Sequence, residues 1–275
     1  MGRPFIKMNG LGNDFVVVEA GAAPFAPSPA HVRAIADREH GVGCDQLIAI
    51  ERGEGPHPFM RIWNADGGEV EACGNGARCV AWLLMQASGS NEAAIDSRAG
   101  LLIARTVGDR KVTVDMGAPR LDWRDIPLAE EMDTRGVELQ VGPVDDPVLH
   151  TPGCVSMGNP HVVFFVPEGA EFDPGKVGPL IENHPLFPEG VNVGFAQIDD
   201  PRRISLTVWE RGAGLTQACG TAACAAVVAA HRRGLSDRRA EVMLPGGALE
   251  IEWREDDGHV LMTGPVAVEF TGALP

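Results

Sequence analysis

Two cysteines of this 275-residue chain stand in the same local sequence. Cys73 lies in NADGGEVEACGNGARCVAWLL and Cys219 in WERGAGLTQACGTAACAAVVAA, so each follows an alanine and precedes a glycine and an apolar run. The apolar runs predict helices that begin just after the cysteines. A helix start presents unpaired amides and the positive end of the helix dipole, which lower the pKa of a thiol and bind an anion such as a carboxylate.

A pair of such thiols suits one kind of reaction. Inverting a stereocentre next to a carboxylate requires a base on one face of the carbon and an acid on the other. Two equivalent cysteines would supply that pair. The glycine after each one, Gly74 and Gly220, would let the carboxylate approach the helix-start amides.

Other interpretations of the cysteines stay open on residue type alone. Cysteine is often a small apolar core residue, and we take that interpretation for Cys79, Cys154 and Cys224, which lie inside apolar runs. Zinc is disfavoured, because the five residues between Cys73 and Cys79 exceed the roughly two to four of typical ligand pairs, and the four between Cys219 and Cys224 stand at the upper end of that range. A Cys-His nucleophile built with His161 would leave the second cysteine without a role. We predict no metal site.

The cysteines mark an internal duplication. They are 219 − 73 = 146 residues apart, and Asn13 and Asn159 are separated by the same 146 residues. Leu101 and Leu249 differ by 148, and Gly117 and Gly264 by 147. Such self-similarity predicts two domains of one architecture, for which 275 residues suffice.

The pattern along each half is strands with one long helix in the middle. A strand, a Gly-rich loop and a second strand are expected over 5–20, and no helix follows them as a dinucleotide fingerprint would require. Ser28 is the expected N-cap of a helix that ends before Gly41. The acidic segment 122–151 is interpreted as the opening of the second unit after a surface crossover. The other predicted elements are strands over 43–51, 94–120, 153–166, 190–198, 202–212 and 259–272, and helices over 74–88 and 220–233. A strand and a short return are expected over 59–72 with a turn at Asp66-Gly67-Gly68, and a hairpin over 240–255 turns at Gly246-Gly247.

Composition excludes several classes of function. The net charge of −15 argues against a nucleic-acid partner, which needs a basic face. No apolar run reaches the length of a membrane span, about 18 to 20 residues, and the N-terminus lacks the apolar segment of a signal peptide. We therefore expect a cytoplasmic protein whose six cysteines are free thiols.

The sequence resembles the diaminopimelate epimerases over nearly its whole length. The segments that carry the resemblance are MNGLGNDF, HGVGCDQL, NADGGEVEACGNGARC, GNPHVVFFV, GVNVGFAQI, WERGAGLTQACGTAAC and LPGGALEIEW. The resemblance implies a homodimeric, cofactor-independent epimerase that interconverts LL- and meso-2,6-diaminopimelate in lysine and peptidoglycan biosynthesis. It also implies an α/β (α+β) fold of two pseudo-symmetric domains, each a mostly antiparallel, barrel-like sheet around a central helix, with the active site in the cleft between them. The domains are expected at 1–118 plus 264–275, carrying Cys73, and at 119–263, carrying Cys219.

The resemblance also implies roles for individual residues. Cys73 and Cys219 match the acid and the base, and His161 and Glu210 match residues that tune the thiols. Arg211 can pair with a distal carboxylate and Glu210 with an ammonium group. Ala222 stands where the family usually has glycine, a small change inside a helix. The matching substrate-binding positions are Asn13, Gln46, Asn64, Gly74, Asn75, Asn159, Asn192, Glu210, Arg211, Gly220 and Thr221.

Two alternatives remain beside this function. Proline racemases, hydroxyproline epimerases and histidine racemases share the fold and the cysteine pair, although WERGAG and GVNV favour a substrate with a second polar head. A non-catalytic protein that holds an amino acid, with its cysteines as packing residues, is the alternative from another class. For any single asparagine, a turn that satisfies its own backbone is the competing explanation. Cys44 receives no role.

Overall fold

The computed structural model describes residues 2–71, 73–143 and 145–274. Its chain divides into two compact units, Met1–Asp115 with Thr263–Pro275, and Met116–Met262, which we call the first and the second unit. The sequence places these divisions after residues 118 and 263. Ala72, part of the repeated Ala-Cys-Gly, lies outside the described residues.

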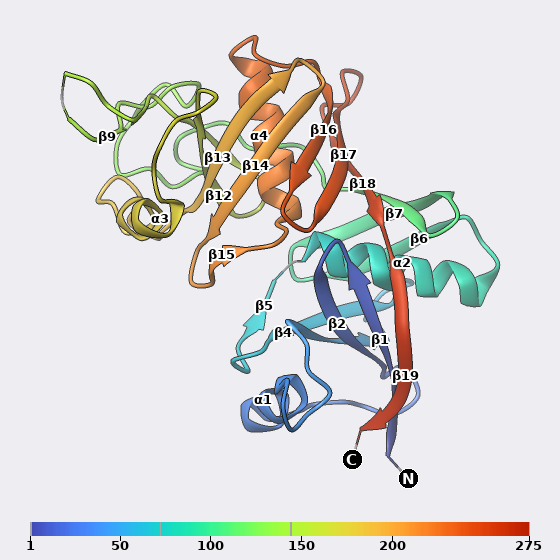
Figure 1. Cartoon of the computed structure of the whole chain (residues 1–275). Helices are drawn as coiled ribbons and strands as arrows, with labels where there is room; N and C mark the ends of the chain where they lie inside the picture. Colours follow the sequence, from blue (N-terminus) through green and yellow to red (C-terminus); the bar gives the residue numbers. More distant parts are fainter. Residues whose placement is uncertain (1, 72, 144, 275) are drawn as a thin grey trace. The chain divides into compact units, whose positions relative to one another are not determined.

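The first unit begins with a hairpin and ends with the C-terminal strand beside it. β19 (Ala267–Leu274) pairs antiparallel with β1, so both termini of the chain lie in this unit (Figure 1). Its other elements are β1 (Arg3–Gly10), β2 (Asn13–Glu19), α1 (Pro29–Ala36), β3 (Gln46–Glu51), β4 (Phe59–Asn64), β5 (Glu69–Val70), α2 (Gly74–Ser88), β6 (Glu92–Ser97), β7 (Gly100–Gly108) and β8 (Lys111–Asp115).

The second unit contains the same series after a short two-stranded sheet. That small sheet pairs β9 with β10 in the segment expected to open the second unit. The elements are β9 (Gln140–Val141), β10 (Leu149–His150), β11 (Gly153–Ser156), β12 (Pro160–Phe165), α3 (Pro174–Glu182), β13 (Asn192–Asp200), β14 (Arg203–Glu210), β15 (Gly214–Thr216), α4 (Gly220–Arg232), β16 (Arg239–Leu244), β17 (Gly247–Trp253) and β18 (Val260–Pro265), which runs across the division.

Strand pairing confirms the duplication. In both units the second strand pairs parallel with the third, the third antiparallel with the fourth, and the fourth parallel with the strand after the central helix. The register also repeats at the sequence offset, because Phe15 faces Gln46 in the first unit and His161 faces Asn192 in the second. The predicted mixed fold, in which most strand pairs are antiparallel, is therefore confirmed.

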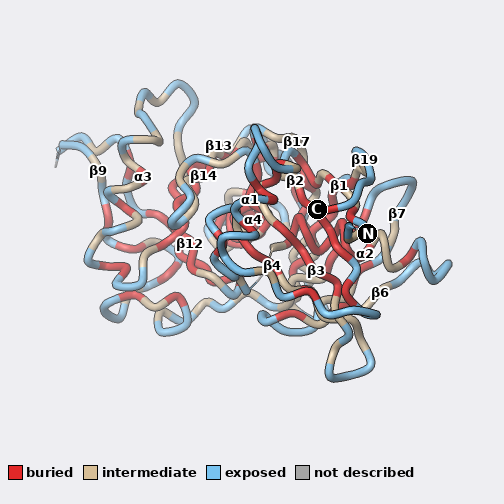
Figure 2. The backbone as a smooth tube through the Cα atoms, turned by 90° about the horizontal axis from the view of Figure 1, so that it is seen from below, coloured by how far each residue is buried: buried red, intermediate tan, exposed pale blue. Residues whose placement is uncertain are grey.

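Each central helix lies inside the curve of its own sheet. α2 contacts β1, β2, β6, β7 and β8, while α4 contacts β11 to β14, β16 and β17. A helix that is apolar all round must be enclosed, and every residue of α4 from Ala222 to Ala230 is buried. Figure 2 shows the buried residues gathered along the inner strands and the exposed ones along the turns. The barrel-like packing follows from this enclosure.

Helix α3 is an element that the sequence does not predict. Its nine residues, PGKVGPLIE, include two prolines and two glycines, which normally break a helix. The N-cap Asp173 accepts a hydrogen bond from the Gly175 amide, and Trp209 of β14 donates its indole N–H to Glu182 over 2.7 Å. The Gly212 amide donates to the same carboxylate over 2.9 Å. Tertiary contacts therefore form α3, and α3 in turn fixes the end of β14.

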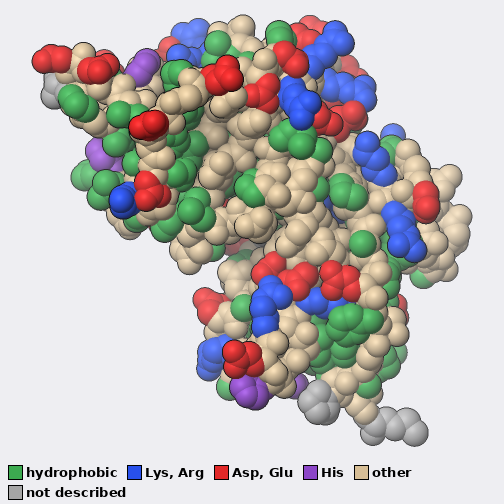
Figure 3. Space-filling view, in the orientation of Figure 1, with side chains coloured by type: hydrophobic (Ala, Val, Ile, Leu, Met, Phe, Trp, Pro, Cys, Tyr) green, Lys and Arg blue, Asp and Glu red, His purple; other side chains and the backbone are tan. Residues whose placement is uncertain are grey.

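On the face drawn in Figure 3, acidic and basic side chains are interspersed, so neither type of charge dominates it. Among the described residues, no helix combines the length and the apolar character needed to cross a bilayer.

The contact between α3 and β14 can be tested at Gly178. A methyl group there would lie 2.4 Å from the indole Cγ of Trp209. The helix propensity gained by alanine, about 1 kcal/mol, is smaller than the cost of displacing a packed indole, about 1 to 3 kcal/mol or more at such overlap. Gly178→Ala should lower the free energy of unfolding in urea titrations by about 1 to 2 kcal/mol.

The matched control is Gly21→Ala, because a methyl group at Gly21 meets no atom within 4 Å. It should change the free energy of unfolding by less than about 0.5 kcal/mol. Equal stability of the two variants would contradict the proposed packing.

Candidate active site

Both cysteines cap the N-terminus of a central helix. Cys73 precedes α2 with φ −148° and ψ 107°, and Cys219 precedes α4 with φ −131° and ψ 107°. The Sγ atom of Cys73 accepts a hydrogen bond from the Gly76 amide at 3.3 Å. The sequence correctly predicts both helix starts. The two half-sites described next belong to separate units.

The first half-site is built from the ends of three neighbouring strands. Asn13 begins β2, Gln46 begins β3 and Asn64 ends β4, so the strand directions bring these amides to one edge of the sheet. Gln46 Nε2 donates to Asn64 Oδ1 at 2.9 Å. Asn13 Oδ1 lies 3.9 Å from Cys73 Sγ, which joins this edge to the start of α2.

Two buried amide oxygens of the first half-site have no hydrogen-bond partner among the described residues. They are Gln46 Oε1 and Asn75 Oδ1, and Asn75 is 2% exposed. Since buried polar atoms are nearly always satisfied, such oxygens indicate a ligand with hydrogen-bond donors. Gly74, also buried, begins the helix beside them.

The second half-site contains a chain of polar contacts that ends at Cys219. His161 Nε2 lies 2.9 Å from Asn159 Oδ1, and Asn159 Nδ2 donates to Thr221 Oγ1 at 3.3 Å. Thr221 Oγ1 is 3.6 Å from Cys219 Sγ. His161 thus reaches the thiol through two intermediates. Gly220 is buried at the first position of α4.

Charged groups stand beside this chain at the end of β14. Glu210 Oε1 accepts a 2.5 Å hydrogen bond from Thr216. The exposed Arg211 donates from Nη1 to the Glu189 carbonyl at 2.9 Å. Buried Asn192 accepts from the Arg211 amide at 3.0 Å and donates to the Pro160 carbonyl at 2.9 Å. The structure therefore assembles the predicted residues of the second unit around the start of α4.

The expected low pKa at the second helix start is wrong for Cys219. Burial raises the pKa of this thiol well above its ordinary value, and the negative charge of Glu210 raises it further. Hydrogen bonds from Thr221 and from the Ala222 amide oppose the rise but are weaker. Cys219, which is 5% exposed, therefore rests as a neutral thiol.

The remaining cysteines are core residues. Burial raises the pKa of Cys79 and Cys154 to about 12 and that of Cys44 to about 11. All six cysteines are free thiols, as predicted. The core interpretation of Cys79, Cys154 and Cys224 is confirmed by their complete burial.

The two half-sites share a backbone but differ in charge. Gln46 corresponds to Asn192 and Asn64 to Glu210, since 46 + 146 = 192 and 64 + 146 = 210. Ala65 corresponds to Arg211 by the same offset. Apart from the thiol of Cys73, the ionisable side chains expected in the site thus all come from the second unit.

Sequence reasoning misses two supporting residues. Asp45 Oδ2 accepts from Asn13 Nδ2 at 2.7 Å, and Thr216 donates to Glu210. The only available signal was their position within the segments GCDQL and AGLTQ.

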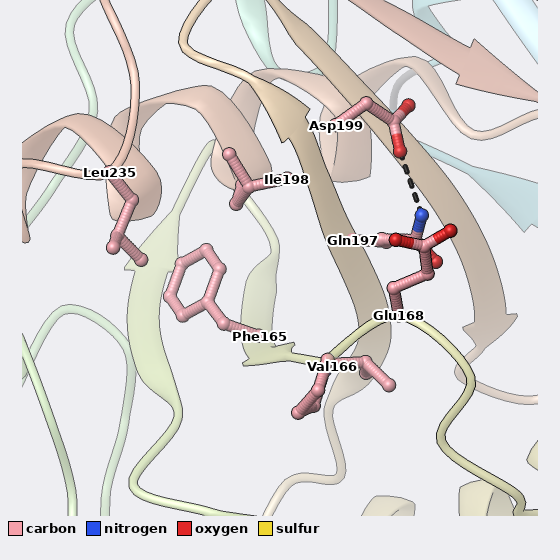
Figure 4. A pocket seen from close by; sticks show the side chains of 8 residues that line it. Phe165, Val166, Glu168, Gln197, Ile198, Asp199 and Leu235 are labelled. Carbon is pink, nitrogen blue, oxygen red and sulfur yellow. Dashed lines mark hydrogen bonds between the residues drawn. The ribbon is translucent and has the colours of Figure 1, made fainter.

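A separate hollow of about 420 Å³ lies elsewhere in the second unit. Phe165, Ile198 and Leu235 form its apolar side, and Glu168, Gln197 and Asp199 its polar side (Figure 4). It lies at the far ends of β12 and β13 from Asn159 and Asn192, and it includes none of the predicted site residues.

Histidine 161 gives the second half-site a pH-dependent contribution to stability. Burial, together with the positive charge of Arg211, lowers its pKa to about 3, against about 6.5 in an unfolded chain. Between these two pKa values, His161 is protonated in the unfolded state and neutral in the folded state. The contribution is therefore fully present above pH 6.5 and is lost as the pH falls towards 3.

The substitution His161→Phe should remove this pH dependence. Phenylalanine fits, because buried Phe15 holds the equivalent place in the first unit. Measured by urea unfolding, wild type should lose about 1 kcal/mol more per pH unit below 6.5 than the variant. His150→Gln, at an exposed position, should keep the wild-type slope. Parallel slopes for wild type and His161→Phe would refute the assignment.

Comparisons with known proteins agree with the arrangement of the chain in two similar units. The family model described as diaminopimelate epimerase matches twice, over residues 5–121 and 153–269. A diaminopimelate epimerase of Phenylobacterium zucineum is 64% identical over 275 residues, which is 100% of this chain and 99% of that protein. One of Acidiphilium cryptum is 56% identical over 272 residues, covering 99% of this chain and 96% of that protein.

Solved structures share the fold at low identity. A predicted epimerase from Pseudomonas aeruginosa has a TM-score of 0.70 at 17% identity and covers 99% of both chains. A hydroxyproline epimerase from Agrobacterium vitis, with bound trans-4-hydroxy-L-proline, has a TM-score of 0.68 at 14% identity, over 99% of this chain and 92% of that one. Since both halves match one family model and whole-length relatives exceed half identity, the chain belongs to the diaminopimelate epimerase family and is an isomerase.

Proposed function

We propose that this protein interconverts LL- and meso-2,6-diaminopimelate, for lysine and peptidoglycan synthesis, with Cys73 and Cys219 as its acid and base and with no cofactor. The observation that carries this proposal is the repeated helix start. In each unit a cysteine caps the buried central helix, and strand-end polar residues stand beside it at the same offset of 146. A core cysteine would not require this repeated polar surrounding.

The half-sites offer groups for each part of an amino-acid substrate. The amides of Gly74, Asn75, Gly220 and Thr221 begin the helices, where amides lack intrahelical acceptors and can bind the α-carboxylate. The unpartnered oxygens Gln46 Oε1 and Asn75 Oδ1 can accept from an ammonium group.

A second head group would find complementary charges in the second half-site. Arg211 can pair with the distal carboxylate, and Glu210 with the distal ammonium group. Asn64, Asn159 and Asn192 offer amide donors and acceptors to either one. Proline and hydroxyproline lack this second head, and for this reason we favour diaminopimelate over the alternative substrates.

The reaction balances as a proton transfer. One cysteine, as thiolate, takes the α-proton, and the electron pair of the broken C–H bond spreads into the carboxylate. The other cysteine, as thiol, gives its proton to the opposite face of the carbon, and the roles exchange for the reverse direction. Helix-start amides stabilise the negative charge that develops on the carboxylate. The neutral resting state of Cys219 equips it to act as the acid.

Exchange of solvent deuterium at the α-carbon tests the proposed function. Meso-diaminopimelate incubated in heavy water should incorporate deuterium and yield the LL isomer, as followed by NMR. Proline offered in the same way should remain unlabelled. Labelling of proline instead would assign the chain to the racemase alternative, and no labelling of any amino acid would leave only a binding protein.

Removing either thiol should sharply lower the rate of epimerisation. Cys73→Ala and Cys219→Ala each lack one proton-transfer group, so we expect epimerisation to fall by at least about 10²- to 10⁴-fold. The matched controls Cys79→Ala and Cys224→Ala remove thiols that lie further along the same helices and are fully buried. Both controls should retain activity within about tenfold of wild type once folded protein is quantified. Full activity of either site variant would refute the two-base scheme.

We also propose that the protein is a cytoplasmic homodimer that meets its second copy along β19. Six free thiols fit a reducing compartment. Strand β19 is exposed on both faces over residues 269–273, and Phe270 is 49% exposed while its ring contacts Phe5. An exposed aromatic residue on a strand is typical of an interaction surface.

The dimer proposal can be tested by sedimentation. Phe270→Glu should convert a wild-type dimer into a monomer at micromolar concentration, because it would bury a charge at the contact. Leu101→Glu is the control, since Leu101 is an equally exposed apolar residue (52%) on β7 of the same unit. A monomeric wild type would overturn the dimer, and a dimeric Phe270→Glu variant would overturn the surface.

A further inference from the structure

The side-chain amide of Asn13 can present either of two ends to Cys73. A carbonyl oxygen accepts from the thiol and favours its protonated form, whereas an N–H group favours the thiolate. Asp45 determines which end is presented. Its Oδ2 accepts from Asn13 at 2.7 Å and from the Asp14 amide at 3.0 Å. Because an ionised carboxylate only accepts, the end that faces Asp45 is the NH₂ group, and Oδ1 faces Cys73 Sγ at 3.9 Å.

A network of three charged residues, Lys7, Asp14 and Arg38, holds Asp45 in place. Arg38 donates to Asp45 Oδ1 at 2.7 Å and to both oxygens of Asp14 at 2.9 Å. The Asp45 amide donates to Asp14 Oδ1 at 2.8 Å. Lys7, only 3% exposed, pairs with Asp14 at 2.6 Å and also contacts the Gly43 carbonyl. Together with Asp45, the network thus contains two acids and two bases, whose charges neutralise one another.

The asparagine of the second half-site is turned the other way. Asn159 directs its Nδ2 towards Thr221 Oγ1, next to Cys219, and its Oδ1 towards His161. The fold of this unit does not require the network. By the 146-residue offset, Lys7, Asp14, Arg38 and Asp45 correspond to Gly153, Pro160, His184 and Val191.

We propose that Asp45 is a positioning residue for proton transfer at Cys73, because it holds the Asn13 carbonyl towards the thiol. The proposal rests on the function proposed above. Asp45 bonds to Asn13, and Asn13 in turn contacts the sulfur, so Asp45 acts through Asn13. The titratable groups that follow Cys73 on its own helix are Arg78 and Cys79, and Cys79 interacts electrostatically with Cys73.

The ionisation of Cys73 is the quantity to measure, because it would not change if Asp45 had only a structural role. In Asp45→Asn the Asn13 amide can turn its N–H group to the sulfur, so the thiolate should form more readily. Asp45→Glu keeps the charge but moves the carboxylate by one methylene, so it should act in the same direction. Iodoacetamide alkylation of the full chain, followed over pH and resolved by peptide mass spectrometry, reports each cysteine separately.

In both variants we expect the Cys73 alkylation midpoint to fall by up to about one pH unit, the effect of one hydrogen bond. The Cys219 midpoint should stay where it is in wild type. The kcat/KM for epimerisation should fall by up to about 10²-fold, because Asn13 is no longer oriented. Glu92→Gln is the control, since it removes a surface carboxylate that pairs with Arg105 in the same unit, and it should change none of these quantities.

The outcomes separate this proposal from the proposed function. An unchanged Cys73 midpoint in both variants would overturn the role of Asp45, and so would a change confined to Asp45→Asn, which would show an effect of charge alone. If Asp45→Asn fails to fold, Asp45→Glu decides by itself. A changed midpoint in a protein whose wild type exchanges no α-proton would overturn the function and leave the positioning of Asn13 intact.

Discussion

The start of a buried helix is the constraint on which each unit depends. α2 and α4 are enclosed by their own sheets, so their first amides lie at the protein interior and need acceptors. Serine, threonine, aspartate and asparagine are the usual N-caps, but both helices use cysteine, a weak acceptor. The Gly76 amide donates to Cys73 Sγ at 3.3 Å, and the Ala222 amide donates to the Cys219 thiol. The helix starts therefore remain suited to bind an anionic ligand next to a thiol.

Enclosure explains why so many residues are small or β-branched around these starts. α4 fits within its sheet because its residues from Ala222 to Ala230, which are buried on every side, are alanine, valine and cysteine. Strands β2, β3 and β4, and their counterparts β12, β13 and β14, then end or begin at the level of the helix start. Because of the strand directions, the polar residues at those strand ends lie beside the cysteine. The same backbone in both units thus yields two similar sites from different side chains.

How far the sequence predicts the structure follows from the physics of each element. The cysteine-capped helices were predictable, because Gly89 and Gly234 end long apolar runs that have no competing interpretation. Helix α3 was not, because its prolines and glycines oppose a helix and only the contacts with Trp209 and the Glu182 carboxylate form it. The pKa of Cys219 was wrongly predicted for a related reason. A helix start is visible in the sequence, whereas the burial and the neighbouring Glu210 that outweigh it arise only on folding.

The division of labour between backbone and side chains fits the chemistry of an epimerase. An α-carboxylate is common to both stereoisomers, and each unit offers the group that the proposed function assigns to it, the amides at a helix start. What a repeated backbone cannot provide is a preference for one end of the substrate. Here the difference comes from side chains: Glu210, Arg211 and His161 belong to one unit, and the charged network around Asp45 to the other. In the proposed reaction, the repeated backbone would serve proton exchange on both faces of a carbon, and the differing polar side chains would bind the molecule in one orientation.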